Sequence, residues 1–295
     1  MNSLSRAQKK LNRKYSSSKE NLYSCKFFQD MCLEFSFVEK KNFFTFEPEE
    51  CEAARLLKNM RHYNYCYEIE QIIDKVIYSL MAYGKAYLYL KPEYTIVKGK
   101  DKTEEKVISG LEIGEIKGFV LKRCRKELKF CCKGVNGTVK ELEMSKGELI
   151  FLSLKDLGYR KNYFTKMVKK LGKFDVTSPS LMLTKNIDGY DFSAYLKKMK
   201  LNKLKVTKDI GCSFEVDGLS DSYILYKKIQ KDKLKIKFLN YIIGKINEGI
   251  TICLKRGDAG KLIVNIKEIN YDQLWEDYYY GKITGTELFE ILYKS

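Results

Sequence analysis

The chain has 295 residues, of which 44% are hydrophobic and 32% are charged. This hydrophobic content is enough for a buried core and too high for an intrinsically disordered chain. The 3 prolines and 19 glycines exclude a collagen-like or low-complexity sequence. No uncharged apolar run approaches the roughly 20 residues of a membrane-spanning helix. The composition therefore predicts a globular protein with no membrane partner.

The charge balance is strongly basic. Lysine and arginine total 55 against 38 acidic residues, which gives a formal net charge of +17, and most of the basic residues are lysine. A positive surface attracts the phosphates of nucleic acid. The richness in Lys, Ile, Asn and Tyr is also typical of an AT-rich genome, so part of this charge can be ordinary solvated surface. Nucleic acid is one expected partner.

The sequence lacks the ligand patterns that are typical of metal sites. There are 9 cysteines without a C-x-x-C pair, and the only histidine is His62. A structural zinc site needs paired ligands at short spacing. The cysteines are therefore predicted to be reduced, mostly buried thiols of a cytoplasmic protein, and no cofactor or metal is expected.

The first half of the chain predicts a helix, a glycine and then strands. A basic arm precedes a helix that is expected within 48–62. Apolar residues recur with the helical period from Glu68 to Tyr83. Gly84 stands where a left-handed residue ends a helix, and alternation predicts a strand at 85–91. Residues 92–114 are interpreted as a charged loop or a poorly ordered excursion. Four short strands are predicted at 116–123, 127–133, 138–144 and 148–154. Asn136-Gly137 is predicted to form a hairpin turn between the second and the third.

The second half is predicted to be mainly helical. Helical periodicity appears at 162–171 and 180–199, and residues 200–218 are basic and then irregular. A long helix at 220–247 is expected to bury an apolar face that includes Ile224, and Thr284 or Thr286 is expected to cap the last helix. The remaining expected elements are a strand at 263–269 and helices at 271–280 and 286–293. The polar face of the long helix carries Lys227, Lys228, Lys231, Lys233, Lys235 and Lys237.

These elements define an α+β fold, helix-rich, with a central and mainly antiparallel β region and long helices. Their order divides the chain into five segments. The segments are a basic mobile arm at 1–26, a helical region ending in a strand at 27–91, a β-rich region at 92–158, a long-helix region at 159–255, and a C-terminal strand with short helices at 256–295.

Catalytic motifs are missing from the sequence. The glycine-lysine pairs lack the upstream glycine and the following hydroxyl of a phosphate-binding loop. A two-metal nuclease needs clustered carboxylates, and the nearest candidates are Asp188 with Asp191 and Asp217 with Asp221. Both pairs stand beside glycines and serines that are typical of turns. The chain is therefore not expected to be an enzyme, and a nuclease is the third hypothesis.

Two groups of residues occur in a familiar order. The first is "IIDKVIYSLMAYGKAYLYL" at 72–90, which contains Gly84, Tyr87 and Leu88, followed by "GFVL" at 118–121, "GELIFLSL" at 147–154 and a helix opening at Ser178-Pro179. The second is Gly281-Lys282-Ile283-Thr284 with Glu287. This order resembles the portal proteins of tailed bacteriophages, in which a G-x-I-T-x-x-E turn lies near the end of the chain. The long helices would then correspond to a portal stem and the β region to a wing.

The resemblance implies a specific function. Portal proteins form a ring, usually of twelve subunits, at one vertex of the virion capsid, and they assemble in the host cytoplasm. Double-stranded DNA passes through the ring during packaging and ejection. The partners implied are the other copies of the chain, the major capsid protein, the terminase, and the neck or adaptor proteins.

The alternative hypothesis is a lysine-rich accessory protein that binds nucleic acid without sequence specificity. It would use the basic arm at 1–26 and the lysine-rich stretch that follows the middle of the chain. The candidate DNA-proximal residues are Lys197, Lys198, Lys200, Lys203, Lys205 and Lys208.

Overall fold

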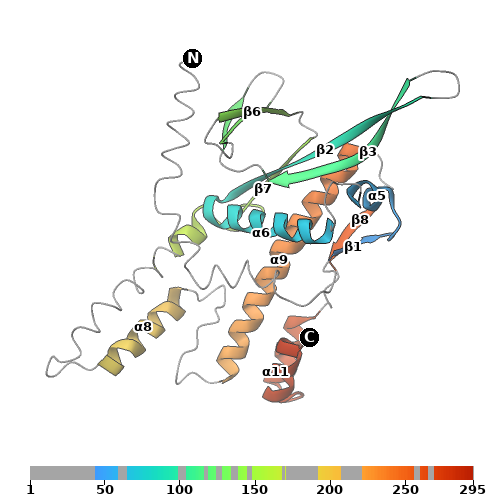
Figure 1. The fold of residues 1–295 in the computed structure, drawn as a ribbon. Coiled ribbons are helices and arrows are strands. Elements are labelled where there is room, and N and C mark those ends of the chain that lie inside the picture. The colour runs from blue at the N-terminus through green and yellow to red at the C-terminus, as the bar shows by residue number, and fades with distance from the viewer. Residues whose placement is uncertain are drawn as a thin grey trace. The chain divides into compact units, whose positions relative to one another are not determined.

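The computed structural model of the chain combines helices with antiparallel strands (Figure 1). The predicted α+β class is confirmed. None of the helices in the described part of the chain has both the length and the apolar character that crossing a membrane requires. The structure describes residues 44–58, 65–98, 104–115, 119–123, 128–133, 139–144, 148–167, 170, 192–206, 221–255, 260–264 and 269–294.

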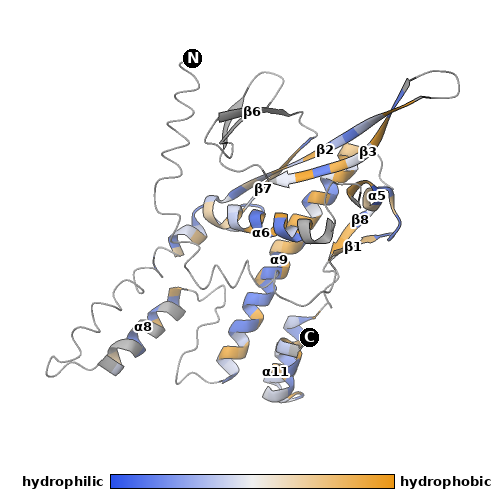
Figure 2. Cartoon of the chain, viewed as in Figure 1, coloured by the Kyte–Doolittle hydropathy of each residue, from blue (hydrophilic) through white to orange (hydrophobic). Residues whose placement is uncertain are grey.

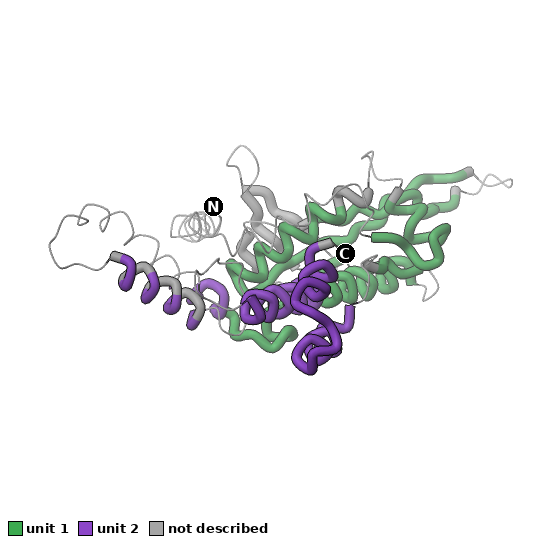
Figure 3. Tube along the Cα trace, turned by 90° about the horizontal axis from the view of Figure 1, so that it is seen from below, with its two compact units in different colours: residues 1–19, 35–161, 239–265 green, residues 20–34, 162–238, 266–295 purple. Residues whose placement is uncertain are grey.

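The chain forms two compact units, which Figure 3 distinguishes by colour. The long helix α9 (Asp221–Leu254) contributes its first part to unit 2 and its last part to unit 1. Each unit combines pieces of several of the five segments defined on the sequence. Unit 1 comprises residues 1–19, 35–161 and 239–265, and unit 2 comprises residues 20–34, 162–238 and 266–295.

The main sheet of unit 1 is built around β2 (Lys85–Lys98). This strand pairs in antiparallel fashion with β3 (Glu104–Glu115) and with β7 (Leu149–Ser153). The helix α6 (Tyr65–Tyr83) packs on β2 and β3, and α5 (Glu52–Lys58) packs on β3. The predicted helix that ends at Tyr83 and the strand that follows it are confirmed.

The interpretation of 92–114 as a charged loop is wrong. β2 and β3 continue through this stretch as a long two-stranded ribbon. Its register shifts at a β-bulge between Glu93 and Tyr94, directly after Pro92. A proline and a bulge interrupt the regular alternation on which the prediction of a strand depends. The strand pattern is therefore hidden in the sequence although the ribbon forms.

The other strands of the described chain, β1, β4, β5, β6 and β8, form two further sheets. β1 (Phe44–Glu47) pairs with β8 (Lys261–Val264), so the strand expected at 263–269 begins earlier than predicted. A separate sheet has the order β4-β5-β6. The three strands of this sheet confirm three of the predicted strands to within a few residues. β5 and β6 pair with each other, as the hairpin prediction expects. The predicted turn residues Asn136 and Gly137 lie outside the described part of the chain. The three strands span Phe119–Arg123, Leu128–Lys133 and Val139–Met144.

The last part of α9 belongs to the core of unit 1. A Cβ atom at Gly249 would collide with Cδ1 of Ile150, so the missing side chain lets the helix approach the sheet closely. The Asn247 side chain also hydrogen-bonds both backbone groups of Leu262, at 2.8 Å each. Buried apolar side chains come from the strands and helices alike, including Phe44, Leu56, Ile73, Ile77, Leu88, Leu111, Leu152, Ile246 and Leu262.

Unit 2 contains the first part of α9 and the helices α8 (Phe192–Val206), α10 (Tyr271–Tyr279) and α11 (Gly285–Lys294). It also contains helical residues at 163–167, within the helix predicted at 162–171. The two C-terminal helices and the long helix are confirmed, and hydrophilic and hydrophobic residues alternate along α9 in Figure 2. The helix predicted to end at residue 199 continues to Val206 in α8. The first part of the helix predicted at 180–199 lies outside the described residues.

Candidate functional site

The portal-like residues of unit 1 lie at the junction between α6 and β2. Gly84 ends α6 with a φ of 72°, and its N–H donates to the carbonyl of Leu80 at 2.7 Å. Its carbonyl accepts the N–H of Leu154 at 3.1 Å. A Cβ atom at this position would collide with the carbonyl oxygen of Lys161. The predicted left-handed helix end is confirmed, and only glycine fits there.

Tyr87 and Leu88 follow Gly84 on β2 and serve the core. Leu88 is fully buried, and Tyr87 is buried beside its cross-strand partner Phe151, with 5.0 Å between the ring centroids. The Tyr87 hydroxyl accepts a hydrogen bond from Lys85 Nζ at 3.3 Å. Gly84 therefore ends the helix, while Tyr87 and Leu88 fix β2 in the core of unit 1.

The portal-like residues of unit 2 form the turn between α10 and α11. Gly281 has a φ of 73°. The Glu287 N–H donates to Thr284 Oγ1 at 3.2 Å, while Glu287 Oε2 accepts the Thr284 N–H at 2.7 Å and its hydroxyl at 2.9 Å. These reciprocal bonds form a capping box, and they lower the pKa of Glu287. The prediction that Thr284 caps the last helix is confirmed.

Loss of this cap should weaken the C-terminal hairpin. We expect Thr284→Ala to lower the free energy of unfolding by about 1 kcal/mol, or roughly 2–4 °C in melting temperature. Thr286→Ala is the matched control, since Thr286 is exposed and lies inside the helix. Thermal denaturation followed by circular dichroism measures both, and equal melting of the two variants would contradict the capping role.

The hairpin formed by α10 and α11 is attached to the first part of α9. Leu288 and Leu292 are buried with Leu225 and Ile229 of α9 in one apolar cluster. At the margin of this cluster the Trp275 ring lies 5.0 Å from the Tyr226 ring. Two polar contacts, Ser222 Oγ to Tyr278 Oη at 2.5 Å and Lys233 Nζ to Asp272 at 2.6 Å, join the same elements. The turn is thus part of a packed structure.

Five of the six candidate DNA-proximal lysines lie on α8. This helix contains five lysines and no acidic residue. Lys197, Lys198 and Lys205 are exposed, and their spacing places them on one face of the helix. The exposed Leu201 lies on that face as well. A rigid row of cations of this kind can contact successive phosphates. Lys200 and Lys203 also belong to α8.

Several residues singled out from the sequence lie outside the described residues. Among the described candidates, the structure places Gly84, Tyr87 and Leu88 together in unit 1, and Gly281, Thr284 and Glu287 together in unit 2. Asp221 is the exposed first residue of α9. The residues outside the described part are His62, Ser178, Pro179, Asp188, Asp191, Lys208 and Asp217.

Three of the six lysines on the predicted polar face of α9 are buried. Lys227 and Lys231 are 3% exposed and Lys235 is 8% exposed. The cause is that α9 is packed on more than one side in unit 2, and the long apolar stem of lysine can be buried. Ile224, expected on the buried face, is instead 37% exposed. Burial also raises the pKa of Asp232, although Lys228 at 2.9 Å opposes the shift.

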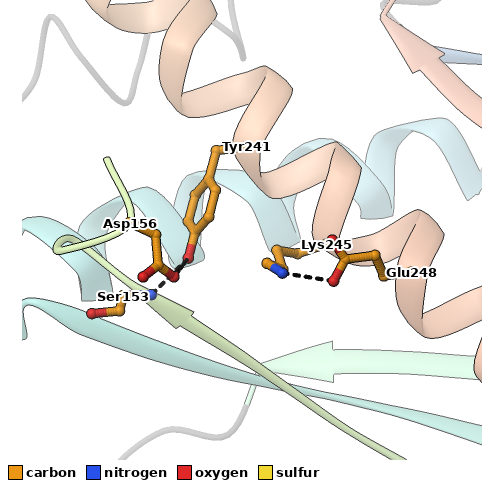
Figure 4. Close-up of polar contacts among 5 residues, drawn as sticks. All are labelled: Ser153, Asp156, Tyr241, Lys245 and Glu248. Carbon is orange, nitrogen blue, oxygen red and sulfur yellow. Dashed lines mark hydrogen bonds and ion pairs between the residues drawn. The ribbon is translucent and has the colours of Figure 1, made fainter. Parts of the chain in front are cut away.

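A polar contact that the sequence does not indicate fixes the last part of α9 to the end of β7 (Figure 4). The Tyr241 hydroxyl donates to Asp156 Oδ2 at 2.6 Å and accepts the N–H of Ser153 at 2.9 Å. Burial and the bond to Asp156 raise the pKa of Tyr241, so the hydroxyl stays protonated. Nearby on α9, Lys245 pairs with Glu248 at 2.6 Å. The contact is structural because both hydroxyl bonds serve packing.

Asp74 on α6 is a second residue that no motif in the sequence indicates. Its Oδ1 atom is buried without a hydrogen-bond partner in the described part of the chain. Burial, together with the charge of Glu70, raises the pKa of Asp74 to about 7. The only signal in the sequence is an acid inside the apolar run Ile72–Ile77. A carboxyl group with this pKa makes the stability of unit 1 sensitive to pH near neutrality.

The described residues contain no cluster of three or more His, Cys, Asp or Glu side chains that could hold a metal ion. Their chemistry is that of packing, helix capping and surface charge. No protein-family model matches the chain, and no curated protein matches it either.

Proposed function

We propose that this chain is a portal-type subunit that assembles into a closed ring through which double-stranded DNA passes. The observation that carries the proposal is the order of its elements. Helix α6, Gly84 and β2 come first, then β7, the long helix α9, β8, and finally the capped turn with Gly281, Thr284 and Glu287. The portal resemblance rests on motifs in this same order. Among the described motif residues, Gly84 and Gly281 have the positive φ that favours glycine, and Thr284 with Glu287 forms a helix cap.

Exposed apolar surface supports assembly with other proteins. Beyond the bulge, the β2–β3 ribbon exposes Tyr94 by 48%, Ile96 by 66%, Val97 by 51% and Val107 by 46%. A two-stranded ribbon without an apolar cover is marginally stable in water, and surfaces of this kind mark interaction sites. Under the proposal its partners are neighbouring subunits, the major capsid protein, the terminase, or neck proteins at the capsid vertex.

Electron microscopy of the purified protein tests the proposal. We expect ring-shaped particles with a central channel, since an interface between two unlike patches closes into a ring when its rotation closes. A field of small single particles without rings would contradict it.

A second candidate function is non-specific binding of nucleic acid, and the exposed lysine face of α8 favours it. Lysine is a point charge that suits phosphates, while the planar fork of arginine suits base edges. A portal must let DNA slide and should bind a duplex weakly, with the binding lost at physiological salt. A dedicated binding protein should keep sub-micromolar affinity at that salt concentration.

Replacing the α8 lysines separates these functions. We expect Lys197→Gln/Lys198→Gln/Lys205→Gln to make the slope of log affinity against log salt shallower by up to about 3, if all three lysines contact phosphates. Lys91→Gln/Lys155→Gln/Lys261→Gln is the matched control, with the same loss of charge at exposed positions. Duplex binding is measured by fluorescence anisotropy at several salt concentrations. Equal slopes for the two variants would exclude α8 as the contact surface.

A further inference from the structure

The α10–α11 hairpin presents aromatic side chains to solvent. Tyr279 and Tyr280 are 74% and 72% exposed, and Phe289 and Tyr293 on α11 are 49% and 51% exposed. The rings form two pairs, with centroids 5.4 Å apart in the first and 4.3 Å apart in the second. Paired rings are already ordered, so a partner would lose little entropy by binding them.

The exposed surface of these four aromatic rings is comparable with the apolar area that protein interfaces bury. An aromatic side chain buries roughly 150–250 Å² when it is covered, so these half-exposed or more exposed rings offer on the order of 400 Å² together. The largest apolar patch of a typical monomer is about 300–600 Å² and is often functional. A stable complex buries about 800 Å² on each partner. The aromatic pairs could therefore supply about half of one side of a stable interface.

The hairpin is an acidic part of a basic chain. Between Tyr271 and Lys294 there are five acidic residues and two lysines, whereas the whole chain carries +17. Glu276 and Glu290 are exposed there. Duplex DNA is a polyanion and would be repelled by this charge. A protein partner with a basic surface fits it instead.

Helix α8 has the complementary surface. It contains five lysines without an acidic residue. Lys197, Lys198 and Lys205 surround Leu201, which is 42% exposed. Cations also stabilise contacts with aromatic faces, as Lys228 over the Tyr293 ring at 5.3 Å already does within the chain. The two surfaces therefore match in charge and in apolar character.

We propose that the α10–α11 hairpin of one copy docks on the exposed face of α8 in a second copy. The inference rests on the proposed ring and names a contact that builds it. The two surfaces differ, so their contact is heterologous and carries one copy onto the next, as a ring requires. Helix α8 then serves assembly, and its exposed lysines face protein in the assembled ring.

Charge reversal on each side tests the contact. One variant is Glu276→Lys/Glu290→Lys, the second is Lys198→Glu/Lys205→Glu, and the third combines all four changes. Glu49→Lys/Glu50→Lys is the control, because both of these residues are exposed and belong to neither the hairpin nor α8. Sedimentation velocity over a range of concentrations gives the concentration for half assembly, and circular dichroism verifies that each variant folds.

We expect each reversal alone to raise the concentration for half assembly by about tenfold or more, because like charges then face each other. The combined variant should return to within about threefold of the unmodified chain, since the charges are complementary again. The control should assemble normally. If both reversals assemble as the unmodified chain does, the ring exists but this contact is wrong.

Two further outcomes would also overturn the inference. An unmodified chain that stays monomeric at every concentration contradicts both the ring and this contact. An α8 reversal that abolishes duplex binding without changing assembly assigns the helix to nucleic acid.

Discussion

Gly84→Val should destabilise unit 1 more than any other single change considered for this chain. Its Cβ would collide with the carbonyl oxygen of Lys161 and lie 2.9 Å from the Cα atom of the same residue, and both are backbone atoms that cannot rotate away. The φ of 72° adds strain for a β-branched residue. We expect a loss of about 3 kcal/mol or more in the free energy of unfolding. Denaturation in urea measures it.

Gly244→Ala is the matched control for this prediction. Gly244 lies inside α9, and no atom lies within 4 Å of the position that a Cβ would take there. Alanine should therefore stabilise the helix by about 0.5–1 kcal/mol, so the two substitutions should act in opposite directions. Unchanged stability of Gly84→Val would mean that the chain does not turn at this residue.

Asp74→Asn should stabilise the protein at alkaline pH and have little effect at acidic pH. The folded chain holds the pKa of Asp74 at about 7, against an ordinary value of 3.8. The folded state thus binds this proton more tightly than the unfolded state does. The free energy of unfolding consequently falls as pH rises from about 4 to about 7, and it stays lower above that range. Asparagine is neutral at every pH and removes this loss.

The expected gain at pH 8 is about 2–4 kcal/mol, or roughly 5–10 °C in melting temperature. Melting temperatures of both proteins at one concentration, from pH 4 to pH 8, give the comparison. Glu93→Gln is the control, because Glu93 is an exposed acid of the same unit. A constant difference between Asp74→Asn and the unmodified chain across this range would show that Asp74 titrates normally.

Features that depend on neighbouring residues could be predicted from the sequence. The periodicity before Tyr83 and the glycine after it locate the end of α6, because helix ends are governed by local backbone conformation. Thr284 and Glu287 are three residues apart, the spacing of a capping box. The α+β class follows from the same local patterns.

Features that depend on distant residues could not be predicted. Tyr241 meets Asp156 across 85 residues of chain, and no short pattern encodes that contact. The burial of Lys227 and Lys231 depends on which elements surround α9 in unit 2. In the candidate sites, the capped turn was therefore predictable, whereas the exposure of Tyr279 and Tyr280 and the face shared by the α8 lysines required the structure.

Light scattering at several protein concentrations tests the central claim most directly. A portal-type ring predicts a mass that rises with concentration to a plateau many times above the 34.6 kDa of a single chain. Twelve copies would give about 0.4 MDa. A mass of 34.6 kDa at every concentration would contradict the account.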